Sequence, residues 1–506
     1  MGQPEVKKLV IVGGGTAGWI TAAAFARLLG ERLEIELVES EAIGTVGVGE
    51  ATIPQIIRLN AILGLDENAF IRATSGTFKL GIEFVDWGRK GSRYLHTFGD
   101  TGMALGNVAF HHYWRKSVAE GAPSSLWDWS LHQMAADGAR FGKLDRIGNT
   151  SMTGLAYAYH FDASRYALFL RAYAEARGVK RTEGIVASVD RDGESGDIAA
   201  ITLQDSKRVA GDFFIDCTGF RALLLGQALG VGYQDWSKWL PCDRALAVPS
   251  ERLPVLVPYT RASAKDAGWQ WRIPLQHRTG NGHVYSSGFT SDEAAADTLL
   301  AGLETKALDD PRPIRFTTGR RETFWAHNCA AISLSSGFLE PLESTSIHLI
   351  QSHVGRLIQL FPRAGDAAAL RAEYNQRCAA EFAQIRDFLI LHYHRTDRED
   401  SEFWRYCRNM DVPDSLTHKL ELFAASGRVG RDVDDLFRDA SWVQVMLGQG
   451  IMPADHDPMA DQVSAAQLAE FLANVKTLTQ RAVASLPTHE EYLLRHCPAD
   501  ASLLAA

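Results

Sequence analysis

The stretch Leu9-Val10-Ile11-Val12-Gly13-Gly14-Gly15-Thr16-Ala17-Gly18 decides the fold of this chain. Its short apolar run is typical of a buried parallel strand, and the periodic stretch 17–29 after the glycines predicts a helix. A second strand is expected over 33–38. Strand, glycine turn, helix and strand form a βαβ unit, so the sequence predicts an α/β fold with a Rossmann-like module.

The glycines have the spacing Gly13-x-Gly15-x-x-Gly18, and Glu39 ends the second predicted strand. Glycines at such a turn let the backbone approach a pyrophosphate, and the helix N-terminus receives its negative charge. An acid at the end of the second strand binds a ribose hydroxyl in this arrangement. The alternative is a tight turn that binds nothing. Because strand, helix and terminal acid are all present, we predict a dinucleotide site.

Two further segments are expected to bring backbone close to the dinucleotide. Residues 43–54 combine three glycines with apolar residues, which favours a segment in contact with the cofactor over a flexible surface loop. Residues 213–219 predict a buried strand that ends in small residues. Before it, the β-rich runs 183–190 and 198–208 flank a turn-rich break and predict a hairpin.

The composition excludes several classes of protein. The chain has 506 residues, 46% hydrophobic and 22% charged, with a net charge of −9. It is too long for a single core and has no basic tract, so we expect several domains and neither a nucleic acid nor a membrane as partner. We find no targeting segment and no run of eighteen apolar residues, and no metal site is predicted. The six cysteines include no Cys-x-x-Cys pair, which fits reduced thiols in the cytoplasm.

A second informative stretch is Trp269-Gln270-Trp271-Arg272-Ile273-Pro274. In a strand, alternation places Trp269 and Trp271 on one face and the polar Gln270 and Arg272 on the other. Taken alone, the two indoles are explained by packing in a core strand.

Together these features resemble known flavoproteins. The glycine loop, the hairpin and a late return to the cofactor resemble the FAD-binding module of flavin monooxygenases, which favours FAD over NAD. Within that group, the hexapeptide 269–274 resembles the hallmark of flavin-dependent halogenases of the tryptophan halogenase-like family. The resemblance extends to about residue 390 and includes Gly49-Glu50-Ala51-Thr52-Ile53-Pro54, Tyr159-His160-Phe161-Asp162-Ala163 and the segment 337–345.

We predict three regions. The FAD-binding module is discontinuous and comprises residues 1–60, 150–225 and 330–365. The substrate domain comprises residues 61–149 and 226–329, and a mainly helical C-terminal region, 366–506, completes it. Oligomeric state does not follow from the sequence, and a homodimer is one assembly that we consider.

The resemblance implies a reaction in two separate places. FADH2, supplied by a separate flavin reductase, reacts with O2 to a hydroperoxide that oxidises chloride or bromide to hypohalous acid. The acid passes through a tunnel to a lysine, and the halogen then adds to an electron-rich aromatic ring. Lys79 matches the family lysine, and Glu343 matches the glutamate proposed to polarise the electrophile or take the ring proton.

Both residues also have plainer explanations. A buried ammonium is a compact hydrogen-bond donor, and burial can lower its pKa, so a buried Lys79 would suit the reaction. The plainer explanation is an exposed charge, because most lysines lie on the surface. The apolar neighbours of Lys79 favour its burial. Glu343 precedes the amphipathic run 347–360 and could serve only to cap that predicted helix.

The remaining site residues are assigned by the same resemblance and by the glycine motif. The halide is expected at Thr345 and Ser346, where a helix begins, although many relatives have glycine at the second position. Trp269 and Trp271 would line the tunnel and keep organic substrate from the flavin. Substrate contacts are assigned to His96, Phe98 and Ser344. Cofactor contacts are assigned to Gly13, Gly15, Thr16, Ala17, Gly18, Glu39, Ala42, Gly47, Val48, Gly49, Glu50, Val186, Gly337, Phe338 and Leu339.

The substrate is expected to be indole or an indole derivative rather than free tryptophan. Family members that act on tryptophan hold its amino-acid end with a C-terminal segment carrying paired tyrosines, and the corresponding stretch here, 427–442, has none. Two other functions stay open. The first is an FAD-dependent aromatic monooxygenase, and the second is a flavin-binding protein without catalytic activity.

Overall fold

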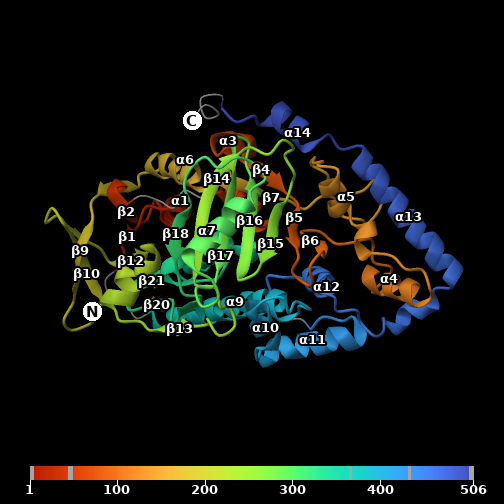
Figure 1. The fold of residues 1–506 in the computed structure, drawn as a ribbon. Helices are drawn as coiled ribbons and strands as arrows, with labels where there is room; N and C mark the ends of the chain where they lie inside the picture. The colour runs from red at the N-terminus through yellow and green to blue at the C-terminus, as the bar shows by residue number, and fades with distance from the viewer. Residues whose placement is uncertain (1–4, 44–48, 364–366, 431–434, 501–506) are drawn as a thin grey trace. The chain divides into compact units, whose positions relative to one another are not determined.

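The computed structural model describes residues 5–43, 49–363, 367–430 and 435–500 (Figure 1). The chain divides into two compact units. Unit 1 comprises residues 1–76, 161–237 and 315–383, and unit 2 comprises residues 77–160, 238–314 and 384–506.

Unit 1 is built on a six-stranded sheet with the order β20-β21-β12-β1-β2-β8. Strand β1 (Lys8–Val12) lies between β2 (Glu34–Glu39) and β12 (Phe213–Asp216), and both are parallel to it. Helix α1 (Thr16–Leu29) connects β1 to β2, so the predicted βαβ unit is confirmed. The outer strands are β8 (Lys180–Glu183), β20 (Trp325–Ala326) and β21 (Cys329–Ala331).

The predicted hairpin is also present in unit 1. Strands β9 (Val186–Arg191) and β10 (Ile198–Leu203) pair antiparallel, and β11 (Arg208–Ala210) extends them to three strands. Glu183, which was expected in the hairpin, is instead the last residue of β8. There it lies opposite Glu39 in the parallel sheet.

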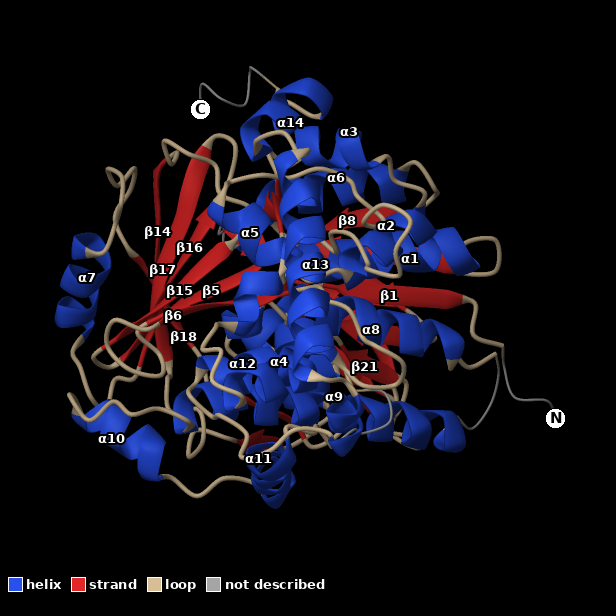
Figure 2. Ribbon diagram, turned by 90° about the vertical axis from the view of Figure 1, so that its right-hand side faces the viewer, coloured by secondary structure: helices blue, strands red, loops and turns tan. Residues whose placement is uncertain are grey.

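The other elements of unit 1 are short strands and helices around these sheets. Helices α1 and α8 pack against each other beside β1 (Figure 2). The elements are η1 (Glu41–Ile43), β3 (Gly49–Ala51), α2 (Gln55–Leu63), α3 (Glu67–Ala73), α6 (Ala163–Glu175), η3 (Gly219–Arg221), η4 (Leu223–Ala228), β13 (Tyr233–Asp235), β19 (Gly319–Arg321), η5 (Ser333–Ser335), β22 (Gly337–Phe338), η6 (Pro341–Glu343) and α8 (Ser346–Gln359).

Unit 2 is built on a seven-stranded sheet with the order β18-β14-β17-β16-β15-β5-β6. The tryptophan hexapeptide lies in β16 (Gly268–Pro274), every residue of which is buried. Helix α7 (Asp292–Ala301) packs on strand β17 of this sheet (Figure 1). The other strands are β5 (Gly81–Val85), β6 (Arg93–Thr97), β14 (Arg244–Glu251), β15 (Thr260–Lys265), β17 (Arg278–Tyr285) and β18 (Arg312–Arg315).

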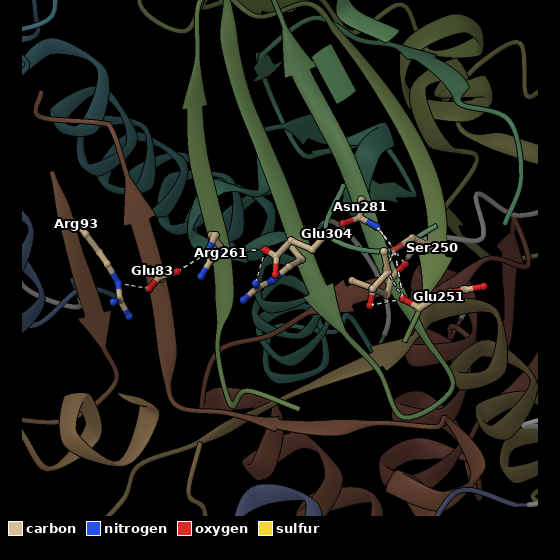
Figure 3. Close-up of polar contacts among 10 residues, drawn as sticks. Glu83, Arg93, Ser250, Glu251, Arg261, Asn281 and Glu304 are labelled. Atoms are coloured by element: carbon tan, nitrogen blue, oxygen red, sulfur yellow. Dashed lines mark hydrogen bonds and ion pairs between the residues drawn. The ribbon is translucent and has the colours of Figure 1, made fainter. Parts of the chain in front are cut away.

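The polar face of β16 is buried rather than exposed to water. Gln270 donates to the carbonyl oxygen of Leu299 in α7, and Arg272 donates to Glu304 at 2.6 Å. The row of ion pairs continues across the sheet, because Glu304 also accepts from Arg261, and Glu83 accepts from Arg261 and Arg93 (Figure 3). Opposite charges paired in this way allow a polar face to be covered by protein.

The C-terminal region is helical, as predicted. Among the described residues, every helix is too short or too polar to cross a bilayer. Helix α9 (Ala368–His394) and strand β7 (Ala158–Asp162) each contribute residues to both units. The remaining elements of unit 2 are β4 (Thr77–Lys79), α4 (Phe110–Ala119), η2 (Leu126–Trp129), α5 (Leu131–Asp137), α10 (Glu402–Asn409), α11 (Asp414–Ser426), α12 (Asp439–Gly448), η7 (Pro458–Gln462), α13 (Ala465–Ala484) and α14 (His489–His496).

Candidate active site

The glycine loop of unit 1 has the geometry that a dinucleotide needs. Gly13 has φ +114°, and a Cβ there would lie 2.2 Å from the Cys217 carbonyl oxygen. A Cβ on Gly18 would lie 1.8 Å from the Gly13 carbonyl oxygen, whereas one on Gly15 would meet nothing within 4 Å. Two glycines are therefore required for close packing, and the third leaves open space beside the backbone.

The N-terminus of α1 is suited to an anion. Its N-cap residue, Gly15, has no side chain to cap the helix, and the first turn, which begins with Thr16 and Ala17, contains no acid. The first N–H groups of a helix have no partner within it and attract negative charge. The loop and the helix end together fit the pyrophosphate of FAD.

Glu39 is held at the edge of this loop by an arginine that the sequence analysis did not single out. Arg181 Nε donates to Glu39 Oε1 at 2.6 Å, and a Cβ on Gly14 would lie 1.5 Å from Glu39 Oε2. Arg181 belongs to β8, more than a hundred residues away, so no local pattern could reveal it. The carboxylate is oriented over the glycine loop, where a ribose hydroxyl is expected.

The other predicted cofactor residues are spread over unit 1. Gly47 and Val48 lie outside the described residues, while Gly49 and Glu50 begin β3. Burial raises the pKa of Glu50 to about 7. Of the rest, Ala42 is exposed in η1, Val186 is the first residue of β9, Gly337 and Phe338 form β22, and Leu339 is buried.

The start of α8 in unit 1 contains a small cavity. It has a volume of about 20 Å³, and its lining includes Gly337, Phe338, Leu339 and Ser346. Ser346 is the first residue of α8, so the unpaired N–H groups of the helix end are adjacent. A cavity of this size holds one small species such as a water molecule or a halide.

The side chain of Thr345 is a second feature at the start of α8 that suits a small ligand. It is the N-cap residue of α8 and is fully buried, but its side chain makes no capping hydrogen bond. Within the part of the chain that the structure describes, its hydroxyl has no hydrogen-bond partner at all. A buried hydroxyl without a partner is costly, which indicates a place for a ligand.

Glu343 ends the short turn η6 and is 1% exposed. Ser344 follows it with φ +57° and turns the chain toward α8. The N-cap of α8 is Thr345. Glu343 therefore does not occupy the N-cap position, which it would need to occupy if it only capped this helix. Glu340, one turn earlier, is a second buried carboxylate that the sequence analysis did not single out.

Lys79 is the last residue of β4 in unit 2. It is fully buried, which confirms the prediction from its apolar neighbours, and its Nζ lies 5.1 Å from the centroid of the Phe98 ring. An ammonium over an aromatic face is stabilised electrostatically, and the effect is stronger away from water. The lysine and one of the predicted substrate residues are therefore brought together.

His96 lies two residues before Phe98 and is 3% exposed. Its ring packs near Phe388 and Phe437, with centroids 5.6 and 6.3 Å away. Phe437 belongs to the stretch that lacks paired tyrosines, and it stacks on Phe388 at 3.8 Å. The apolar rings of Phe388 and Phe437 therefore lie beside His96, and the sequence analysis assigned neither to the site.

Trp269 and Trp271 lie on one face of β16, as predicted, with ring centroids 6.1 Å apart. Trp269 packs near Trp87, at 6.3 Å. Trp271 covers Gly282 on the neighbouring strand, where a Cβ would lie 2.0 Å from the indole. Both indoles are buried in unit 2, as are Lys79 and His96, and Phe98 of the same unit is half-buried.

Comparisons with known proteins agree with this geometry. The family model described as tryptophan halogenase matches residues 8–465. The chain is similar to the solved structure of Xcc4156, a flavin-dependent halogenase from Xanthomonas campestris, with 51% identity and a TM-score of 0.95 over 98% of this chain and 100% of that one. It is also similar to BrvH, a flavin-dependent halogenase from Brevundimonas sp. BAL3, with 44% identity and a TM-score of 0.94 over 98% and 100%.

A curated relative gives the same result. The tryptophan 6-halogenase SttH from Streptomyces toxytricini is 36% identical over 96% of this chain and 97% of its own length. The chain therefore belongs to the tryptophan halogenase family and is a flavin-dependent halogenase, an oxidoreductase.

Proposed function

We propose that this protein chlorinates or brominates indole or an indole derivative, with hypohalous acid as the halogen donor and Lys79 as the residue that delivers it. The observation that carries the proposal is the complete burial of Lys79, with its ammonium over the Phe98 ring. Burying an ammonium group costs free energy, and packing alone gives no reason for a lysine at a fully buried position.

The residues of the glycine loop bind the cofactor. Gly13, Gly15 and Gly18 admit the pyrophosphate, and Glu39, oriented by Arg181, accepts from a ribose hydroxyl. When FAD that a separate flavin reductase has reduced is bound here, it oxidises halide to hypohalous acid with O2. The end of α8 binds the halide through its N–H groups and the Thr345 hydroxyl.

Lys79 and Glu343 act on the halogen and on the ring. The Lys79 ammonium donates a hydrogen bond to hypohalous acid and makes the halogen more electrophilic. The ring π electrons form the carbon–halogen bond while the oxygen–halogen bond breaks and releases hydroxide. The Glu343 carboxylate then accepts the ring proton, which combines with the hydroxide to give water.

The indole preference is supported by the rings beside His96. Phe388 and Phe437 are apolar, so they supply no donor or acceptor for an amino-acid ammonium or carboxylate. A site that recognises only the aromatic ring favours indole over tryptophan.

The product of one incubation tests this function. The protein is mixed with FAD, a flavin reductase, NADH, O2, bromide and either indole or tryptophan, and the products are weighed by mass spectrometry. We expect bromoindole to form at least about tenfold faster than bromotryptophan. Tryptophan would bind without contacts to its ammonium and carboxylate groups, and the loss of those contacts costs more than about 1.4 kcal/mol. An oxygenated indole without bromine would instead identify an aromatic monooxygenase.

A further inference from the structure

A chain of hydrogen bonds runs through four strands of unit 2 and ends on the tryptophan hexapeptide. His160 Nε2 lies 2.9 Å from Thr260 Oγ1, and His160 Nδ1 lies 2.9 Å from Thr77 Oγ1. The Thr77 hydroxyl in turn donates to the carbonyl oxygen of Pro274 at 2.7 Å. All of these groups are buried, and Thr77 is two residues before Lys79 on the same strand.

The direction of every hydrogen bond in this chain is fixed. A carbonyl oxygen only accepts, so the single hydroxyl proton of Thr77 goes to Pro274. Thr77 Oγ1 must then accept from His160, which places a proton on Nδ1. In a neutral imidazole the other nitrogen accepts, so the Thr260 hydroxyl donates to His160 Nε2.

A second histidine holds the next residue of the same strand. The backbone N–H of Phe78 donates to His489 Nε2 at 3.1 Å, and His489 Nδ1 donates to the carbonyl oxygen of Leu256 at 3.0 Å. His489 is the first residue of α14 and is fully buried. The ring of Phe78 also stacks on Phe141 with centroids 4.1 Å apart, so β4 is fixed from several sides.

Both histidines are kept neutral. Burial lowers the pKa of His489 to about 4. Burial also lowers the pKa of His160, and the nearby positive charge of Lys79 lowers it further, together with His489 and Arg272. The lowered pKa keeps the His160 ring neutral, so Nε2 stays an acceptor for the Thr260 hydroxyl, whereas a protonated ring would donate to that hydroxyl instead.

We propose that His160 and His489 are positioning residues that hold strand β4, and with it the Lys79 ammonium, in place against the end of the tryptophan hexapeptide. The proposal rests on the function proposed above for Lys79. His160 acts through Thr77 and His489 acts through the backbone of Phe78, so neither needs to touch substrate. The segment Tyr159-His160-Phe161-Asp162-Ala163 thereby gains a function in the reaction.

The proposal predicts that variants of these residues still form hypohalous acid but use less of it to halogenate the ring. A loosened β4 displaces Lys79 without affecting the production of hypohalous acid at the flavin. Displacing a reacting group by about 1 Å lowers a rate by about 10²-fold. The informative quantity is therefore the ratio of ring halogenation to total hypohalous acid, the latter trapped with monochlorodimedone when no aromatic substrate is present.

Two valine variants of similar shape give a matched comparison. Thr77→Val removes the hydroxyl that links His160 to Pro274, whereas Thr260→Val breaks only the far end of the chain and leaves that link intact. We expect the ratio to fall at least about tenfold in Thr77→Val and by less than about twofold in Thr260→Val. A purely structural role would lower stability and both activities together, and would leave the ratio unchanged.

Substitutions at the histidines supply the second comparison, which also serves if Thr77→Val yields little folded protein. His160→Asn keeps a donor near the position of Nδ1 and should retain most of the ratio, whereas His160→Leu and His489→Leu should lose it. If folded Thr77→Val, His160→Leu and His489→Leu all keep the ratio of the unmodified protein, the positioning proposal is wrong.

Lys79→Ala, measured in parallel, separates the two proposals. If Lys79→Ala abolishes ring halogenation while the variants of Thr77, His160 and His489 keep the ratio, only the positioning proposal fails. If Lys79→Ala itself halogenates at the unmodified rate, the function proposed for Lys79 fails.

Discussion

The Thr77 hydroxyl donates a 2.7 Å hydrogen bond to the carbonyl oxygen of Pro274, which ends the tryptophan hexapeptide. The last residue of the hexapeptide is therefore joined by a hydrogen bond to the strand that carries Lys79. This contact lies wholly within unit 2, where Lys79, Phe98, His96 and the hexapeptide are all found.

Glu343 is predicted to accept the ring proton, so removing its charge should slow ring halogenation alone. We expect Glu343→Gln to lower kcat by about 10²-fold, the lower end of the usual range for a general base, with an unchanged yield of trapped hypohalous acid. Glu343→Asp keeps a carboxylate and should recover part of the rate. A Glu343→Gln variant that halogenates at the unmodified rate would exclude this function.

Thr345 is predicted to bind the halide through its buried hydroxyl. Thr345→Val keeps the shape of the side chain and removes that donor, and a lost hydrogen bond to a charged group is worth about 1.5–3 kcal/mol. The KM for halide should therefore rise about tenfold or more, while the KM for the aromatic substrate is unchanged. Steady-state rates at varied bromide concentration measure both, and an unchanged halide KM would contradict the assignment.

Glu381 is predicted to make the stability of unit 1 depend on pH. His348 Nε2 lies 2.9 Å from one of its oxygens, and Ser352 and Arg356 donate to the other. Burial would raise the pKa of Glu381, but the hydrogen bonds and charges of His348 and Arg356 outweigh it and lower the pKa well below its usual value. The carboxylate therefore stabilises the fold above its unfolded pKa, and this contribution is lost as pH falls toward the lowered value.

Glu381→Gln measures that contribution. At pH 7 we expect the variant to lose about 3 kcal/mol of unfolding free energy, because it leaves a buried charge unpaired. The difference from the unmodified protein should shrink as the pH is lowered below about 4.3, the usual pKa of glutamate. Denaturant unfolding at several pH values measures it, with Glu373→Gln, in the exposed pair with Arg377, as the control. A difference independent of pH would show that the charge of Glu381 is not responsible.

Features formed by neighbouring residues were predictable from the sequence. The glycine loop lies within one βαβ unit, so its strands and helix follow from local periodicity. The burial of Lys79 follows from the apolar residues beside it. In both cases the pattern that predicts the structure lies within a few residues of the feature itself.

Features formed by distant residues were not predictable. His489 accepts from Phe78 although 411 residues separate them, and nothing in the sequence around either residue indicates the contact. The buried polar face of β16 is another example. Alternation places Gln270 and Arg272 on one face, but only the fold shows that α7 and Glu304 cover it.

The delivery of halogen by Lys79 is the central claim, and one variant tests it most directly. With FAD, reductase, NADH, O2 and bromide present, trapped hypobromous acid and brominated indole are measured for Lys79→Ala and for the unmodified protein. We expect Lys79→Ala to form hypobromous acid at the unmodified rate and to brominate indole at least about 10³-fold more slowly, a loss of about 4 kcal/mol in transition-state stabilisation. Bromination of indole at the unmodified rate and at the same ring position would contradict the account.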